Sequence, residues 1–426
     1  MCTLLALVVA LVSAAPMPAQ ELGDRSREKM AEPRMGSSFG GALVVVPPDS
    51  PESRPRIAVA NERCPLDVVN ASGRVYVFSD GWGSRTRVLS GSVVGTEFGT
   101  CLAANASWLV VGVSTTFDSD APAALEVYSA SDLEHVRRIE IAAGHSVRSL
   151  GFVPDADADG IDDVLVEART WKPKTSERGV RLVIVSMATG ALVRELSASG
   201  QRKFDGGRLF FAHDSSSVSP WIAGTTVVSV DEQPDRRWGA VLLSLTGETQ
   251  YVPFDASKGV PPVGALDLRR FTAPDPTPVT LVAVDQSPEF LRVLWLEANS
   301  VEKETGLVLQ EVDLPRFVPE LSVGHTSTDL DRDGVPDFVA SGRIDRADLD
   351  CLTLVAFDGK AGRPLWQWTN DLIEADQGPI VSAWDVDADG VTDLLVGVTP
   401  CSGRGTSAAF LVSGATGKIL ASFREP

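Results

Sequence analysis

Cationic side chains and long apolar runs are scarce in this chain, and each scarcity excludes a class of function. The 426 residues include 38 Lys and Arg against 57 Asp and Glu, a formal net charge of −19 at pH 7. Because a nucleic-acid backbone is bound through cationic side chains that release its counterions, we expect no nucleic-acid partner. After the first 20 residues, no segment reaches the roughly 18 consecutive apolar residues of a membrane-spanning helix, so we expect no transmembrane segment.

Groups that could perform catalysis are also few. The chain has four histidines, and none lies in a spacing typical of a Ser/His/Asp triad or of a metal site: His135, His145, His213 and His325. It has no phosphate-binding glycine loop and no nucleophile elbow. We therefore assign no catalytic residue and favour a protein without enzymatic activity.

The N-terminus has the pattern of a secretory signal peptide, predicted at residues 1–19. Leu4–Ala15 is apolar and small residues suited to cleavage lie at Ala14 and Ala19, although no Lys or Arg precedes the apolar part. We expect an exported protein, secreted or extracytoplasmic, with residues 20–35 as a polar tail. Removal of the signal peptide takes Cys2 with it and leaves an even number of cysteines, which predicts two disulfides with three possible pairings: Cys64, Cys101, Cys351 and Cys401.

An aspartate-rich pattern occurs three times: DADADGIDD from Asp155, DLDRDGVPD from Asp329 and DVDADGVTD from Asp385. Each copy has Asp at positions 1, 3, 5 and 9 and Gly at position 6. Carboxylates that converge on one point repel each other strongly unless a cation neutralises them. Oxygen ligands at this spacing, with Gly where the backbone turns sharply, suit Ca²⁺ with its 6–8 oxygen ligands.

The sequence therefore predicts about three Ca²⁺ sites. Each would use the four carboxylates and the backbone carbonyl of position 7: Asp155, Asp157, Asp159, Ile161 and Asp163; Asp329, Asp331, Asp333, Val335 and Asp337; Asp385, Asp387, Asp389, Val391 and Asp393. Position 12, where an EF-hand needs a bidentate Glu, is Val166, Ala340 or Val396, and a strand follows each loop. We therefore expect structural calcium loops in β-hairpins; Mg²⁺ fits less well, and hydrated Asp/Gly turns are the alternative.

Short runs of β-branched and aromatic residues, separated by turn clusters, recur along the whole chain. The interval from Asp155 to Asp329 is 174 residues, three times 58, and Phe39 and Phe98 lie 59 residues apart. A turn of the form Ser-x-Ala-Thr-Gly also recurs, at Ser186–Gly190 and Ser413–Gly417. This spacing predicts seven units of about 57 residues, of which the fourth and fifth are degenerate. The units span approximately residues 36–92, 93–144, 145–204, 205–261, 262–319, 320–376 and 377–426.

Four short strands at this period are typical of a β-propeller blade, with a sheet solenoid as the alternative. We predict an all-β fold, a seven-bladed β-propeller of four-stranded antiparallel blades with calcium-binding β-hairpin loops. The first blade would pack on the last without exchanging strands. In such a meander the cysteines fall at one end of the ring, which favours the pairs Cys64–Cys101 and Cys351–Cys401. Each disulfide would contribute roughly 3–4 kcal/mol by loop entropy; free buried thiols are the alternative.

Phe-Gly at a strand start, the Asp-x-Asp-x-Asp-Gly-x-x-Asp loop and a following Leu-Leu-Val-Gly resemble the FG-GAP repeat of the integrin α-subunit propeller. The resemblance also extends to related repeats in secreted bacterial proteins and covers about residues 36–426. It is strongest in the third, sixth and seventh units. Two features differ, because the calcium loops here are not contiguous and the Gly-Ala-Pro element is altered, as in Ala60-Asn61-Glu62.

This resemblance implies a binding or adhesion module for an extracellular protein or carbohydrate ligand. In integrins the ligand face lies opposite the calcium loops, and by analogy the segment Ala168–Gly179 would lie there. This segment carries Trp171, Lys172 and Lys174, an aromatic side chain with two cations in an acidic protein. The alternative function is a polysaccharide-active propeller enzyme, a lyase or glycosidase that would use carboxylates on the propeller axis.

Overall fold

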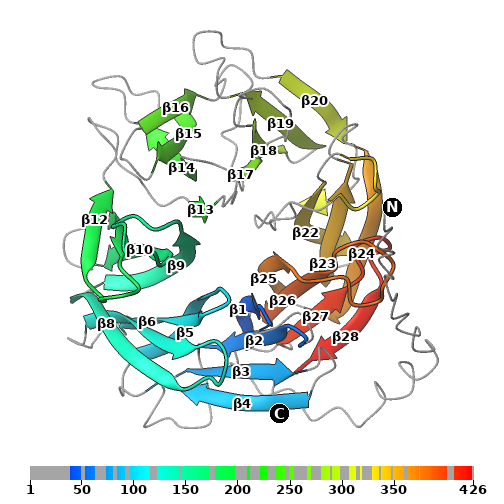
Figure 1. The fold of residues 1–426 in the computed structure, drawn as a ribbon. Coiled ribbons are helices and arrows are strands. Elements are labelled where there is room, and N and C mark those ends of the chain that lie inside the picture. Colours follow the sequence, from blue (N-terminus) through cyan, green and yellow to red (C-terminus); the bar gives the residue numbers. More distant parts are fainter. Residues whose placement is uncertain are drawn as a thin grey trace, which may run out of the picture.

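A computed structural model shows a chain of β-strands (Figure 1). The structure describes residues 39–48, 53–62, 73–79, 84–91, 96–115, 122–143, 145–171, 178–196, 329–334, 337–346, 349–358, 363–373, 375–400 and 407–424. Between residues 209 and 318 it describes the backbone of the strands alone. The predicted signal peptide and polar tail lie outside these residues.

Within the described residues, consecutive strands form four-stranded antiparallel sheets, numbered here in chain order. Sheet 1 contains β1 (Phe39–Val46), β2 (Arg56–Asn61), β3 (Arg74–Ser79) and β4 (Ser84–Ser90). Sheet 2 contains β5 (Thr96–Ala104), β6 (Trp108–Thr115), β7 (Pro122–Ser129) and β8 (His135–Ala143). Sheet 3 contains β9 (His145–Val153), β10 (Asp163–Trp171), β11 (Arg178–Val185) and β12 (Leu192–Leu196).

The second part of the chain repeats this order. Sheet 4 contains β13 (Leu209–Phe211), β14 (Trp221–Val228), β15 (Arg237–Ser244) and β16 (Thr249–Pro253). Sheet 5 contains β17 (Leu266–Arg269), β18 (Thr280–Ser287), β19 (Phe290–Glu297) and β20 (Leu307–Val312). Sheet 6 contains β21 (Phe317–Val318), β22 (Phe338–Arg346), β23 (Leu349–Phe357) and β24 (Pro364–Ile373). Sheet 7 contains β25 (Ala375–Ser382), β26 (Leu394–Pro400), β27 (Ala408–Val412) and β28 (Ile419–Phe423).

The all-β, antiparallel class predicted from the sequence is therefore confirmed. Figure 1 shows the sheets arranged around a ring, with β1 and β25 on the inner side and β4 and β28 on the outer side. Two boundaries differ slightly from the predicted units, because β21 begins at Phe317 and β25 at Ala375. The predicted boundaries at residues 320 and 377 followed the repeat spacing alone, which does not record where the first strand of a unit starts.

Where the structure describes their side chains, middle strands have long apolar runs that are buried on both faces. Ile57 to Ala60 in β2 and Ala408 to Val412 in β27 are buried without interruption. Continuous apolar runs of this kind are expected where a sheet packs on neighbours at both faces. The fourth strands differ, since β12 and β28 have mostly exposed or half-buried residues.

Separate apolar cores hold neighbouring sheets together. One core joins sheets 1 and 2, a second joins sheets 2 and 3, and a third joins sheets 6 and 7. A further core joins the first sheet to the last, where the rings of Phe78 and Phe423 lie 5.1 Å apart between centroids. Sheet 1 thus packs on sheet 7 while both keep their own four strands.

The two Phe-Gly pairs explain how the first strands approach their neighbours. Phe39 and Phe98 are fully buried, and each precedes a glycine with positive φ, 89° at Gly40 and 92° at Gly99. Both lie at register shifts in their strands, where left-handed backbone is typical of a bulge. A Cβ on Gly397 would lie 2.1 Å from the Gly40 carbonyl oxygen, so this glycine lets β26 approach β1 closely.

The predicted Cys64–Cys101 disulfide is wrong, because Cys101 is a free, buried thiol. Alternation along β5 places Phe98 and Leu102 in the core toward sheet 1, whereas Cys101 lies in the core toward sheet 3. Cys64 follows β2 of sheet 1 and is outside the described residues, as is Cys401; the side chain of Cys351 in β23 is also not described. Burial raises the pKa of the Cys101 thiol to about 12. The pair Cys351–Cys401 stays a prediction.

Candidate metal centres

The three Asp patterns lie next to the first and second strands of their sheets. The first joins β9 to β10, and the third joins β25 to β26. The second directly precedes β22. Position 9 of each pattern lies at or just before the start of a second strand, and Asp163, Asp337 and Asp393 are all fully buried.

The loop backbones share one conformation. At position 4, φ is 64°, 64° and 59° for Ala158, Arg332 and Ala388. At position 6, φ is 86°, 87° and 84° for Gly160, Gly334 and Gly390. Positive φ is uncommon for residues other than glycine, so its recurrence at position 4 marks a defined loop conformation in place of three unrelated turns.

Hydrogen bonds from the loop amides hold the carboxylates in place. The position 6 amide donates to the position 1 carboxylate in each loop: Gly160 to Asp155 at 2.7 Å, Gly334 to Asp329 at 2.7 Å and Gly390 to Asp385 at 2.8 Å. The position 2 amide donates to the position 9 carboxylate: Ala156 to Asp163 at 2.8 Å, Leu330 to Asp337 at 2.5 Å and Val386 to Asp393 at 2.7 Å. These bonds fix carboxylates from both ends of the loop around its interior.

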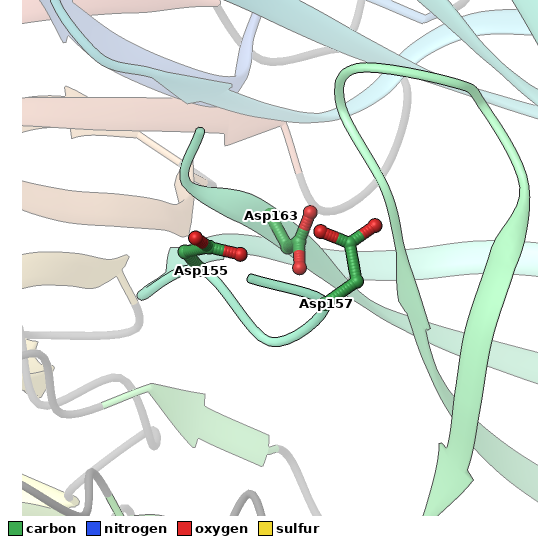
Figure 2. Close-up of side chains that lie close together, drawn as sticks. All are labelled: Asp155, Asp157 and Asp163. Atoms are coloured by element: carbon green, nitrogen blue, oxygen red, sulfur yellow. The ribbon is translucent and has the colours of Figure 1, made fainter. Parts of the chain in front are cut away.

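The structure brings three predicted ligands together in each loop, with one oxygen from each carboxylate within 4.8 Å of the others: Asp155, Asp157 and Asp163; Asp329, Asp331 and Asp333; Asp385, Asp387 and Asp393. Figure 2 shows the first group, with the three side chains turned toward a common space inside the loop. Positions 1 and 3 are thus present in every group, whereas the third member is position 9 in two loops and position 5 in one.

The other predicted ligands lie outside these groups. Asp159 accepts hydrogen bonds from the Ile161 amide at 2.9 Å and the Ser186 hydroxyl at 3.4 Å. Asp389 accepts from the Val391 amide at 2.8 Å. Among the residues predicted to offer carbonyl ligands, Ile161 is exposed and Val391 is buried, and Val335 lies outside the described residues.

Burial and mutual repulsion disfavour negative charge on several of these carboxyl groups. Burial, with a smaller contribution from Asp387 and Asp389, raises the pKa of Asp393 to about 7. Burial is also the largest cause that raises the pKa of Asp163 and of Asp387. For Asp155 the direction reverses, because the hydrogen bond from the Gly160 amide lowers the pKa of this carboxyl. A bound cation offsets such a buried cluster of charge most effectively.

Sequence reasoning missed how these loops contact the turn after the third strand. Asp163 accepts from the Met187 amide at 3.3 Å, and Asp393 accepts from the Gly414 amide at 3.0 Å. These amides belong to the two recurring Ser-x-Ala-Thr-Gly turns, Ser186–Gly190 and Ser413–Gly417. The signal was present in the sequence, since both turns occur in units that carry an Asp loop.

A second missed contact joins the loops of sheets 6 and 7. Nη2 of Arg332 donates to the carbonyl of Asp389 and lies 3.7 Å from its carboxylate. Arg332 occupies position 4 of one loop and Asp389 position 5 of the next. The spacing of the pattern contains no information on this contact, which depends on how two sheets pack.

Comparisons with known proteins identify no family. No family model matches the chain, and no curated protein matches it. The resemblance to the FG-GAP repeat therefore stays a prediction.

Solved structures give distant likenesses in fold. A Dos1 propeller has a TM-score of 0.47 at 10% identity, covering 87% of this chain and 78% of that one. A hypothetical selenium-binding protein from Sulfolobus tokodaii has a TM-score of 0.47 at 11% identity, covering 78% of this chain and 79% of that one. BBS1N in complex with ARL6DN has a TM-score of 0.44 at 10% identity, covering 92% of this chain and 91% of that one. Among the residues that the structure describes, no helix has the length and hydropathy needed to cross a membrane.

Proposed function

We propose that this protein is an exported, calcium-stabilised, seven-bladed β-propeller that binds an extracellular protein or carbohydrate. The four-stranded antiparallel sheets and the packing of sheet 1 on sheet 7 support the propeller arrangement. The calcium part is carried by one observation. Three loops, far apart in the chain, share the same positive-φ positions and gather three carboxylate oxygens within 4.8 Å.

The ligand chemistry favours Ca²⁺ over other metals. Each site offers carboxylates, with no imidazole or thiolate within the groups. Oxygen-only ligands suit Ca²⁺ and Mg²⁺, but Mg²⁺ prefers to keep most of its water and a strict octahedral geometry. Because the loops of sheets 3 and 7 connect the first two strands to the turn after the third, a bound ion would stabilise the inner half of these sheets.

Metal analysis of the purified full chain tests this proposal. We expect about three Ca²⁺ per chain, and calorimetric titration of the metal-free protein should show binding of Ca²⁺ in preference to Mg²⁺. Asp387→Ala should reduce the count by about one, whereas Asp132→Ala, at an exposed turn of sheet 2, should leave it unchanged. A chain that binds no Ca²⁺ at millimolar concentration would contradict the proposal.

The partner part of the proposal is supported by the connection between β10 and β11. Trp171 ends β10 in the described structure, and Lys172 and Lys174 follow outside the described residues. Tryptophan is among the residues that most often anchor an interface.

Immobilised polysaccharides and extracellular-matrix proteins, probed with the calcium-loaded chain, test this part. We expect binding that Trp171→Ala weakens, without release of new reducing or unsaturated sugar ends. Release of such ends would instead show a lyase or glycosidase and overturn the binding module. An absence of binding to all of these surfaces would also overturn it.

A further inference from the structure

Sheet 3 contacts sheet 2, and sheet 7 contacts sheet 6, in the same way. Arg137 lies on β8, the fourth strand of sheet 2, and donates from its two terminal nitrogens to the carbonyls of Met187 and Ala188 in sheet 3, at 2.7 Å for Ala188. Trp366 lies on β24, the fourth strand of sheet 6, and its Nε1 donates to the Gly414 carbonyl in sheet 7 at 2.7 Å. In both cases the fourth strand of one sheet binds the turn between β-strands three and four of the next.

The same residues of the turn also contact the Asp loop. Met187 donates its amide to Asp163 and accepts from Arg137 at its carbonyl. Gly414 donates its amide to Asp393 and accepts from Trp366 at its carbonyl. One residue of the turn therefore lies between the fully buried position 9 carboxylate and a side chain of the neighbouring sheet.

The glycines that end these turns make room for the neighbouring strand. Gly190 and Gly417 have φ of 76° and 70°. A Cβ on Gly417 would lie 2.6 Å from the Trp366 ring, and one on Gly190 would lie 3.4 Å from Ile139 of β8. The turns are therefore fitted to the preceding sheet through packing as well as hydrogen bonds.

A donor on the carbonyl side of these turns affects the carboxylate on the amide side. The two hydrogen bonds are made by different peptide groups of one residue, so the donor acts on the carboxylate through the position of the turn. A turn held from outside loses less conformational freedom when the Asp loop closes around an ion. This effect favours the ion-bound loop.

We propose that Arg137 and Trp366 are positioning residues for the calcium sites of sheets 3 and 7. Each residue orients the turn whose amide holds the position 9 carboxylate, and it thereby couples ion binding to the packing of one sheet on the next. This inference rests on the proposed binding of Ca²⁺. Because coupling between two equilibria is reciprocal, loss of the inter-sheet contact must weaken ion binding at that site.

The test measures calcium affinity at one site at a time in the full chain. For the sheet 3 site, Asp331→Ala and Asp387→Ala remove a ligand from each of the other loops. For the sheet 7 site, Asp157→Ala and Asp331→Ala do so. Arg137→Met keeps the aliphatic part of the side chain and removes the donors, and Trp366→Phe keeps an aromatic ring without the N–H.

We expect Arg137→Met to weaken the sheet 3 site about fivefold to tenfold, the lower range of measured coupling factors, and to leave the sheet 7 site unchanged. Trp366→Phe should do the opposite, and Arg137→Lys should recover part of the affinity. Arg181→Met is the matched control, because Arg181 pairs with Glu195 at 2.7 Å on the outer side of sheet 3.

Three outcomes would overturn the inference. The first is Ca²⁺ binding at both sites with affinities that neither substitution changes. The second is equal weakening of both sites by each substitution, which would show general loss of stability instead of positioning. If Arg137→Met does not fold, Arg137→Lys and Trp366→Phe still decide between these outcomes. The third is a chain without any of these substitutions that binds no Ca²⁺, which would overturn the proposed function itself and this inference with it.

Discussion

The β5–β6 hairpin of sheet 2 and the β9–β10 hairpin of sheet 3 occupy equivalent places but hold the following turn differently. In sheet 2 the Asn105 side chain accepts from the amides of Ser107 and Trp108 at 2.9 Å each. The Ser107 carbonyl then accepts from the Ala130 amide at 2.8 Å. In sheet 3 the corresponding acceptor for Met187 is the Asp163 carboxylate.

The turns themselves are alike in both sheets. Leu133 donates its amide to the Ser129 carbonyl in sheet 2, and Gly190 donates to the Ser186 carbonyl in sheet 3. Both have positive φ at the donor residue. The difference therefore lies in the acceptor, which is a neutral backbone carbonyl in one hairpin and a buried carboxylate in the other. Under the proposed function a bound cation would stabilise the carboxylate, whereas the neutral carbonyl would gain nothing from one.

Removal of the buried Asp163 carboxylate should lower the free energy of unfolding more than the other changes proposed for these two sheets. Asp163→Ala leaves the Ala156 and Met187 amides without their acceptor, and each unsatisfied buried amide costs about 1–3 kcal/mol. We expect the free energy of unfolding to fall by about 2–4 kcal/mol, measured by urea denaturation in calcium. Ser107→Ala is the control, since sheet 2 uses the backbone carbonyl at that residue. Equal stability of the two variants would contradict the comparison.

A smaller loss of stability is expected for a change in the β5–β6 hairpin of sheet 2, where the acceptors are neutral. Asn105→Ala removes the side-chain acceptor of two amides, and we expect a loss of about 1 kcal/mol, typical of a lost cap. Because the acceptors in this hairpin are neutral, we expect the same loss in calcium and in EGTA, as read from denaturation midpoints. A loss that appears only in calcium would show that sheet 2 also depends on an ion.

The smallest effect concerns Cys101, on the face of sheet 2 that packs on sheet 3. Its buried thiol has a pKa of about 12, so little thiolate forms at pH 8. Peptide mapping after maleimide treatment should find Cys101 unlabelled in the folded protein and labelled in denaturant without reductant. Recovery of Cys101 in a disulfide-linked peptide would contradict the free thiol in the structure.

Much of the fold was predictable because its signals are local. Strand runs such as Ile57–Ala60 and the spacing of the Asp loops follow from side-chain periodicity and from ligand chemistry. The face of the sheet on which a side chain lies was harder to predict, as the Cys101 prediction shows. Position along a strand does not say which neighbouring sheet the side chain contacts. The contacts of Arg137, Arg332 and Trp366 depend on packing between sheets, and residues about 50 apart in sequence form them.

Thermal unfolding of the full chain with and without EGTA, alongside a metal count, tests the central claim most directly. An ion that binds only the folded state raises the melting temperature by mass action. We predict about three Ca²⁺ per purified chain and a melting temperature that falls on chelation and recovers on addition of Ca²⁺ but not of Mg²⁺. An unchanged melting temperature together with no co-purified calcium would contradict the account.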